Sequence, residues 1–248
     1  MRIKGALHVH SILSHDGTMT IAELAAWYRN KGYQFIAIGD HSQDLDEAAV
    51  EIMKQQSAEN SDAGFLVIPG IEFSCQGGIH IFGMGVTRLM AEIDPVRVSE
   101  GIRAHDGFSV LAHPSRRRWE CSAELLLAVD AAEFWNVSYD GKYLPSFKAP
   151  GAFRKMQKVN PNLRAVAGHD FHRKPTFYDV GIEMEVDMLS RESILGCMRH
   201  AAYHIRSRLF FADPKSRISG AKSALLYMMS RPLAAARKAR NAVSRWST

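Results

Sequence analysis

The sequence predicts an α/β fold in which strands and helices alternate along the chain. Eight short apolar runs, several of them continuously hydrophobic, are typical of strands buried on both faces of a sheet. They cover residues 3–9, 35–39, 65–71, 79–86, 108–112, 131–135, 164–168 and 180–186. Six amphipathic segments have the spacing of surface helices, at residues 20–31, 44–60, 94–106, 121–129, 149–159 and 190–201. Strands that alternate with helices predict a parallel sheet or a barrel.

The first of the amphipathic segments carries clear end signals for a helix. Thr20 and Glu23 have the spacing of a capping box, in which each side chain binds the backbone of the other residue. Gly32 lies just past the last residue of the segment, where glycine commonly ends a helix. We therefore expect this helix to begin directly after Thr20.

The length of 248 residues suits one large domain, and the composition changes once, near Asp213-Pro214. Residues 214–248 contain eight basic residues and no acidic one, so residues 1–213 carry a net charge of −3 although the whole chain carries +5. We expect a barrel domain over 1–213 and a basic, helical tail over 214–248. The tail could pack on the domain, bind nucleic acid, or lie on an anionic lipid surface.

Composition also limits the class of protein. No apolar run approaches the length of about 18 residues that a membrane-spanning helix needs, and no apolar core of a signal peptide follows the first residues. The three cysteines, Cys75, Cys121 and Cys197, form no CxxC pair. An odd number without close pairs argues against a disulfide framework and favours a reducing, cytoplasmic location.

Residues that commonly bind metals follow five of the apolar runs, and a further histidine lies within a sixth run. They are His8, His10, Asp40, His41, Glu72, His80, His113, Asp170 and His172. The C-terminal ends of parallel strands gather at one face of an α/β fold, so these residues should converge. Side chains two apart on a strand point the same way. We therefore expect His8 and His10 to face one centre, as Asp170 and His172 should.

The number of candidate ligands indicates more than one ion. The candidates are His8, His10, Asp16, His41, Glu72, His80, His113, Asp170 and His172. One ion with four to six ligands cannot use nine, whereas two or three divalent ions can, with Glu72 bridging a pair. Imidazole and carboxylate without thiolate suit Mn, Zn or Fe and do not decide among them.

Taken in order, the motifs of the chain resemble those of the PHP (polymerase and histidinol phosphatase) domain superfamily. The motifs are HxHSxxSHDG, DHS, PGIEFS, HIFGMG, AHP and GHDFH, and the resemblance covers about residues 3–206. The resemblance implies a distorted (β/α)7 TIM-like barrel with its metal centre at the C-terminal face of the strands. It also implies three sets of ligands. These are His8, His10, Glu72 and Asp170; Glu72, His80 and His113; and Asp16, His41 and His172.

The sequence differs from the pattern of the superfamily in two motifs. Both His15 and Asp16 stand where relatives use either of two adjacent positions, so His15 could replace Asp16 as a ligand. The last motif reads GHDFH where many relatives have GSDAH, and His169 is thus an additional imidazole without an assigned role.

The resemblance and the expected metals together predict a metal-dependent phosphoesterase. A metal-bridging hydroxide would attack the phosphate of a small phosphorylated metabolite or a nucleotide, with Glu72 and Asp170 acting as catalytic metal ligands. Arg116 and Arg117, shortly after His113, are candidates to bind the substrate phosphate, although an arginine run can also be a solvated loop. The alternatives are an exonuclease that trims oligonucleotide ends and a non-catalytic metal-binding module.

Overall fold

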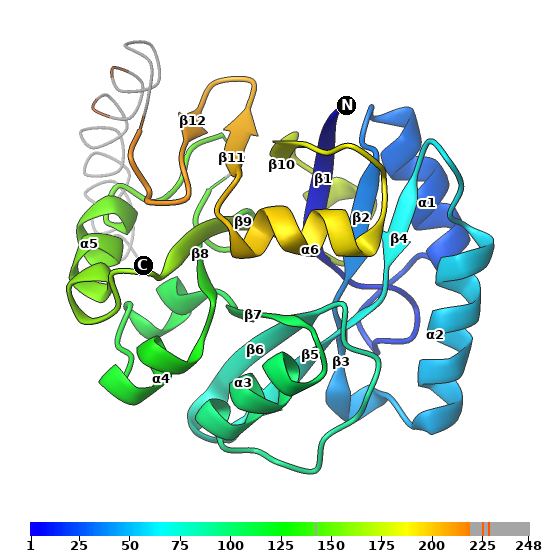
Figure 1. Ribbon diagram of the computed structural model, residues 1–248, viewed down its shortest axis with the longest axis horizontal. Helices are drawn as coiled ribbons and strands as arrows, with labels where there is room; N and C mark the ends of the chain where they lie inside the picture. Colours follow the sequence, from blue (N-terminus) through cyan, green and yellow to red (C-terminus); the bar gives the residue numbers. More distant parts are fainter. Residues whose placement is uncertain (142, 219–224, 226–227, 229–248) are drawn as a thin grey trace, which may run out of the picture.

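A computed structural model describes residues 1–141 and 143–218, together with Leu225 and Met228. The described residues form a mixed α/β fold with twelve strands in one sheet and six α-helices (Figure 1). Almost all of the predicted tail, 214–248, lies outside the described residues. Residues 214–218 still contact the domain, since the Pro214 carbonyl accepts a hydrogen bond from the Ala165 amide at 2.7 Å.

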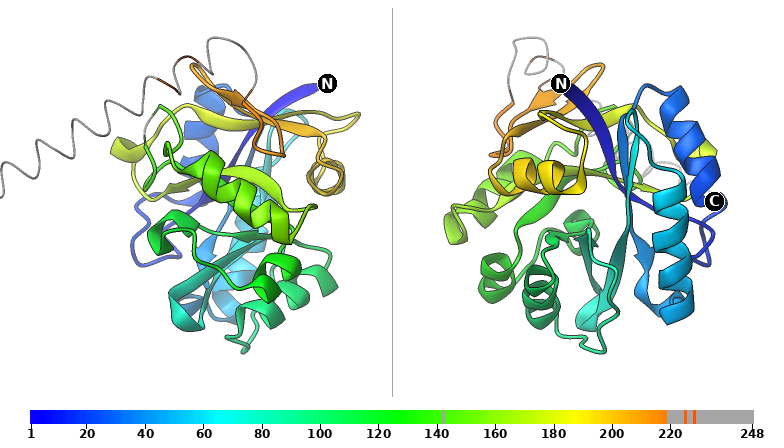
Figure 2. Two further views of the ribbon diagram at one scale, coloured as in Figure 1. Left: turned by 90° about the vertical axis from the view of Figure 1, so that its left-hand side faces the viewer. Right: turned by 45° about the vertical axis from the view of Figure 1, so that its right-hand side comes forward.

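All six amphipathic segments form helices. The helices are α1 (Ile21–Asn30), α2 (Glu47–Glu59), α3 (Pro95–Ala104), α4 (Ala123–Ala128), α5 (Ala149–Val159) and α6 (Arg191–Arg199). The capping box at the start of α1 is confirmed, because the Thr20 hydroxyl accepts from the Glu23 amide and the Glu23 carboxylate accepts from the Thr20 amide. Helices α1 and α2 lie side by side on one flank of the molecule, and α3 and α4 are neighbours on another (Figure 2).

The strands coincide with the apolar runs, with three additions. They are β1 (Arg2–Val9), β2 (Phe35–Ile38), β3 (Asp40–His41), β4 (Leu66–Ile68), β5 (Gly70–Cys75), β6 (Ile79–Met84), β7 (Phe108–Leu111), β8 (Ala131–Asn136), β9 (Arg164–Phe171), β10 (Val180–Glu185), β11 (Tyr203–Ser207) and β12 (Phe211–Ala212). The strand order is β12-β11-β10-β1-β9-β8-β7-β6-β5-β3, and β2 pairs with β1 and β4.

The expected (β/α)7 barrel is not confirmed, because the sheet is mixed and does not close. Strands β1, β2, β4, β7, β8 and β9 form parallel pairs, but β6 runs antiparallel to both β5 and β7. The reason is the connection between β5 and β6, which is only the three residues Gln76–Gly78. A parallel partner would need a crossover of a dozen or more residues.

Two single residues interrupt the sheet near its open edge. Gly39 separates β2 from β3, and Pro69 separates β4 from β5. Proline has no amide hydrogen to donate to a neighbouring strand, so the ladder is broken at Pro69. Beyond these points β3 pairs in parallel with β5, and the register places His41 beside Glu72.

The interior of the fold is apolar and continuous. Its largest fully buried side chains include Trp135, Phe35 and Phe82. All three cysteines are unpaired, as expected from their number and spacing. Among the residues that the structure describes, no helix is both long enough and apolar enough to cross a membrane.

Candidate metal centre

Five histidine rings surround the carboxylate of Glu72, which is fully buried. The ring nitrogens come from the ends of different strands and their following loops. Their distances to a Glu72 carboxylate oxygen are 3.3 Å for His8, 3.7 Å for His10, 2.9 Å for His41, 3.0 Å for His80 and 3.0 Å for His113. Residues from 8 to 113 thus meet at one point, as the positions at the strand ends predict.

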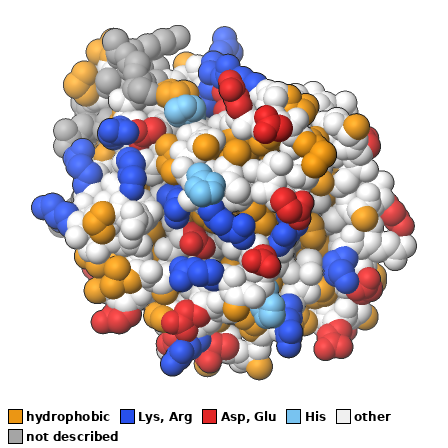
Figure 3. All heavy atoms as spheres, in the orientation of Figure 1, with side chains coloured by type: hydrophobic (Ala, Val, Ile, Leu, Met, Phe, Trp, Pro, Cys, Tyr) orange, Lys and Arg blue, Asp and Glu red, His pale blue; other side chains and the backbone are white. Residues whose placement is uncertain are grey.

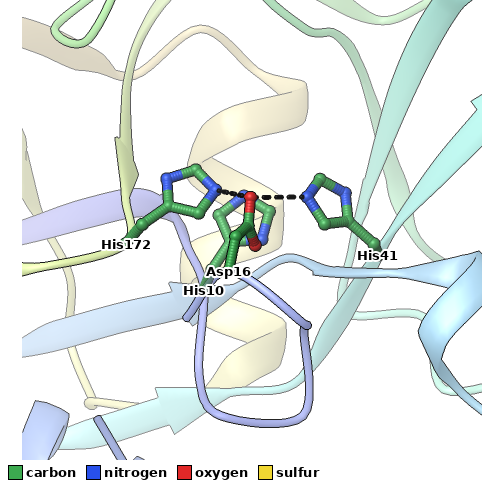
Figure 4. A group of neighbouring side chains, drawn as sticks. All are labelled: His10, Asp16, His41 and His172. Atoms are coloured by element: carbon green, nitrogen blue, oxygen red, sulfur yellow. Dashed lines mark ion pairs between the residues drawn. The ribbon is translucent and has the colours of Figure 1, made fainter. Parts of the chain in front are cut away.

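A second group of side chains gathers around Asp16 (Figure 4). One Asp16 oxygen lies 3.5 Å from His41 Nε2 and 3.1 Å from His172 Nε2. His10 completes the group, with its ring stacked on that of His172 at 4.1 Å between centroids. The opposite nitrogen of His41, Nδ1, is the one directed at Glu72, so His41 joins the two groups, as His10 does.

Asp170 closes the cluster on the remaining side. Its Oδ1 lies 3.4 Å from His10 Nε2 and 3.9 Å from His8 Nε2. All nine side chains that the sequence suggests as ligands are therefore brought together. His15 is directed elsewhere, because its Nδ1 lies 2.7 Å from Asp44 and its side chain is 63% exposed. The geometry favours Asp16 over His15 at this loop.

Unusual backbone geometry aims these side chains. His8, His113 and Asp170 have φ angles of 63°, 31° and 49°, a region that residues other than glycine seldom adopt. Between β1 and β9 the register passes from Leu7 opposite Gly168 to Val9 opposite Phe171. Two residues, His169 and Asp170, thus face His8 alone, which is the arrangement of a β-bulge.

The bulge changes the reason for the convergence. His8 and His10 do face one centre, but regular strand alternation is not the cause, and that part of the expectation is wrong. The backbone of His8 is in the left-handed region, and His10 lies past the end of β1. The same holds for Asp170 and for His172, which lies past the end of β9. Strained backbone at a cluster of ionisable groups is typical of functional sites.

The donor atoms at the centre of the cluster lack ordinary partners. His8 Nε2, His10 Nε2, His41 Nδ1 and a Glu72 oxygen are buried and form no hydrogen bond of suitable geometry among the described residues, although His41 Nδ1 lies 2.9 Å from that oxygen. A buried polar atom left unpaired costs about 1–3 kcal/mol. Divalent cations bound among these atoms would satisfy them, and imidazole with carboxylate suits Mn, Zn or Fe. The residues present therefore fit a metal centre.

The donor atoms fall into three groups, each with its atoms within 4.8 Å of one another. The groups are His8, His10 and Glu72; His41, Glu72 and His80; and His10, Asp16, His41 and His172. They overlap with the three implied ligand sets, but His10 and His41 each join two groups, and Asp170 and His113 belong to none of the three. Three groups are compatible with the expectation of two or three ions.

The electrostatics of the cluster favour positive charge at its centre. Burial opposes ionisation of Glu72, but His8, His113 and His41 lower the pKa of its carboxyl well below the usual range. Burial likewise opposes protonation of His8, yet Glu72 and Glu133 raise the pKa of its ring well above the ordinary value. An ionised carboxylate is thus held among imidazoles, where a divalent cation would bind favourably.

Glu133, on β8, supports the His8 ring and the backbone of His113, and it was missed by sequence reasoning. One carboxylate oxygen lies 2.8 Å from His8 Nδ1, and the other accepts from the His113 amide at 2.6 Å and from Asn136 Nδ2 at 2.7 Å. A carboxylate behind a ligand histidine fixes the orientation of the ring and raises its basicity. The available signal was a carboxylate inside the otherwise apolar run at 131–135.

Gly168 makes room for this carboxylate. A Cβ at position 168 would lie 1.8 Å from a Glu133 oxygen, so no larger residue fits without moving Glu133. Asp40, which also follows an apolar run, has a supporting role of another kind. Its carboxylate accepts from the Ser11 amide and from the Ser11 and Ser14 hydroxyls at 2.6–2.9 Å, and so holds the loop that carries Asp16.

His169 lies outside the cluster although it belongs to the GHDFH motif. Its Nε2 donates to the Val180 carbonyl, and its Nδ1 accepts from the Tyr28 hydroxyl at 2.9 Å. Burial lowers the pKa of the ring to about 4. Both ring nitrogens are satisfied by protein groups, so His169 is a neutral core histidine.

The two arginines suggested for substrate binding have different surroundings. The Arg116 guanidinium lies 4.8 Å from the centroid of the Tyr139 ring, and that ring lies 5.4 Å from the His113 ring. The Arg117 guanidinium instead donates to the Gly77 carbonyl in the turn between β5 and β6. Arg116 is thus beside the cluster, whereas Arg117 is bonded to a neighbouring turn.

Comparison with known proteins points to one family. The model of the PHP domain family matches residues 6–139. The DNA polymerase/3'-5' exonuclease PolX of Bacillus subtilis (strain 168) is 43% identical over 79 residues. That match covers 29% of this chain and 14% of the polymerase, so it concerns only a small part of the longer protein.

Solved structures share the fold at low sequence identity. A two-domain protein from Bacteroides vulgatus that contains a predicted PHP-like metal-dependent phosphoesterase superposes with a TM-score of 0.62 at 15% identity, covering 86% of this chain and 66% of that chain. The lesion-specific endonuclease Q of Pyrococcus furiosus gives a TM-score of 0.58 at 17% identity, covering 86% and 59%. The chain therefore spans less than two thirds of each of these proteins.

Proposed function

Because the chain belongs to the PHP domain family, we propose that it is a metal-dependent hydrolase of phosphate esters, with its metals held by the nine clustered side chains. The observation that carries this proposal is the set of buried, unpartnered donor atoms around Glu72. Two or three ions of Mn, Zn or Fe are the expected occupants. All nine ligand positions are present, which argues against a non-catalytic module.

Divalent ions at such a site supply Lewis acidity toward phosphoryl oxygens and make water a stronger nucleophile at neutral pH. The chain itself supplies orientation. Glu133 binds the ring of His8 and the backbone amide of His113, and the Asp170 carbonyl accepts from His172 Nδ1 at 2.8 Å, which turns His172 Nε2 toward Asp16. Preorganised donors of this kind spare the reorganisation that a mobile site would need.

Direct attack by water is favoured over a covalent cysteine mechanism. Cys75 ends β5, the strand that carries Glu72, and burial raises the pKa of its thiol to about 12. Burial also raises the pKa of Cys121 to about 11. Neither thiol would be a thiolate near neutral pH, and the thiolate is the reactive form.

Arg116 is the better candidate to bind the substrate phosphate. Its guanidinium lies over the Tyr139 ring, and that ring neighbours His113 of the cluster. The Arg117 guanidinium instead donates a hydrogen bond to the Gly77 carbonyl. The substrate would be a small phosphorylated metabolite or a nucleotide. By their names, two of the similar proteins are nucleases, which brings phosphodiesters within the substrates to be tried.

The proposal is tested by hydrolysis of p-nitrophenyl phosphate and bis(p-nitrophenyl) phosphate by the purified chain, before chelation, after chelation, and after Mn is restored. We expect turnover of at least one ester that chelation abolishes and Mn restores. Asp170→Asn should lose that turnover, and Lys158→Ala, an exposed change on α5, should retain it. Turnover that survives chelation, or that persists in Asp170→Asn, would contradict the proposal.

A further inference from the structure

A groove leads away from the metal centre toward α5. One cavity of about 500 Å³ is lined by Arg116 and Tyr139, the pair that contacts His113. A second cavity of about 970 Å³ continues along α5. Four residues line both cavities: Arg118, Trp119, Phe147 and Lys148. The two cavities are therefore parts of one groove, and the first part lies beside Tyr139, whose ring neighbours that of His113.

Positive charge is distributed along the whole groove. The lining cations are Arg116, Arg118, Lys148, Arg154 and Lys155. Within the described parts of the chain, none of them forms an ion pair, although Lys and Arg elsewhere on the domain frequently do. Figure 3 shows Lys and Arg side chains gathered on the left-hand side of the molecule, around α5. Unpaired cations in a groove attract a polyanion.

The acidic residues of the groove offset little of this charge. Asp140 accepts from the Asn136 amide at 2.8 Å and is only partly exposed. Glu120 lies on the α5 side, where Arg154 and Lys155 outnumber it.

Aromatic side chains stand between the cations. Tyr139 is 49% exposed and Phe147 is 38% exposed, and the partly buried Trp119 lines both cavities, as Phe147 does. Arg118 and Trp119 have φ angles of 56° and 66°, so the backbone holds a left-handed conformation where it presents them. Cations that follow a backbone, alternating with rings on which bases stack, are the common features of surfaces that bind single strands.

We propose that this groove binds single-stranded nucleic acid and passes the strand to the metal centre. The scissile phosphate would lie at the cluster, the next nucleotide beside Arg116 and Tyr139, and later nucleotides along Arg118, Lys148 and α5. The orientation of the strand rests on the proposed hydrolase function, but binding in the groove does not.

Binding is therefore measured without turnover. The full chain, in a chelator, is titrated into a fluorescein-labelled single-stranded octanucleotide, and anisotropy is followed at several salt concentrations. The triple variant Lys148→Ala/Arg154→Ala/Lys155→Ala should bind at least tenfold more weakly. The slope of log affinity against log salt should fall by about 2, at about 0.7 per lost phosphate contact. Phe147→Ala should also weaken binding by about tenfold through lost stacking.

A second triple variant controls for net charge. Arg88→Ala/Arg97→Ala/Lys158→Ala removes three exposed cations outside the groove and should bind like the unaltered chain. Equal losses in both triple variants, or an unchanged salt slope in the groove variant, would overturn the proposal. Equally effective competition by polyglutamate would also overturn it, because the groove would then bind any polyanion. If hydrolysis fails while groove-dependent binding holds, the failure belongs to the proposed function.

Discussion

Two kinds of buried histidine occur within one molecule, and their ring nitrogens differ. His169 is 2% exposed and both of its nitrogens bind protein groups, Val180 and Tyr28. His8 and His10 are 0% exposed, and in each ring Nε2 has no hydrogen-bond partner among the described residues. All three histidines lie in metal-type motifs. The partner of each nitrogen, and not the motif, separates a core histidine from a candidate ligand.

The largest effect is expected at the carboxylate that the unpartnered nitrogens share. Glu72→Gln keeps the size of the side chain but removes the charge that five rings surround. We expect kcat/KM for the preferred ester to fall roughly a thousandfold or more, because charge stabilisation is lost in the transition state. Circular dichroism should show an intact fold. Activity within tenfold of the unaltered chain would mean that Glu72 is not central.

A smaller effect is expected at Glu133, the carboxylate that binds His8 Nδ1. Glu133→Gln keeps the size of the side chain but has one accepting oxygen in place of two, so it cannot accept from both His8 Nδ1 and the His113 amide, and it loses the negative charge that makes His8 more basic. Metal affinity should weaken about ten- to a hundredfold. Competition with a metal-sensitive dye measures it directly. Unchanged affinity would show that Glu133 serves the fold alone.

The smallest effect is expected at His169, the core histidine that lies outside the metal cluster. The pKa of His169 lies near 4 in the fold and near 6.5 when exposed, so the neutral ring stabilises the fold above pH 6.5. That stability is lost as the pH falls from 6.5 toward 4, by about 1.4 kcal/mol per pH unit. His169→Gln can still donate to Val180 and accept from Tyr28 without titrating.

Urea unfolding at pH 7 and pH 5 tests this difference. Between these values the unaltered chain should lose about 2 kcal/mol more than His169→Gln, and metal content should be the same in both. A variant that lost metal would place His169 among the ligands after all. Equal pH dependence in both chains would show that His169 is already charged in the fold.

The sequence predicts the helices well and the sheet less completely. All six amphipathic segments are helices because each has one apolar face to bury. Strand β11 was not predicted, since it is short and alternates buried Tyr203 and Ile205 with exposed His204 and Arg206 in an antiparallel pair. The direction of β6 depends on the three-residue turn before it, which the apolar pattern does not report.

The candidate site, like the fold, was predicted only in part. Residue type and position in or after the apolar runs indicated eight of the nine side chains that converge. Asp16 lies in the loop after β1, and Asp40, which also follows a run, holds that loop instead. The bulge that turns His8 and Asp170 inward was not predictable from period-two alternation, because it breaks that alternation. Glu133 was missed because it lies in an apolar run, where its burial makes sense only once His8 is placed beside it. Sequence pattern gives the candidate ligands, and tertiary contacts give the residues that support them.

The most direct test is the metal content of the purified full-length chain, measured by inductively coupled plasma mass spectrometry after reconstitution and gel filtration. Unpartnered nitrogens around Glu72 predict two or three Mn, Zn or Fe ions per chain, and a clear loss of metal in Glu72→Gln. A chain that retains no divalent metal after reconstitution would contradict the account, since its buried nitrogens would then lack the ligand that explains them.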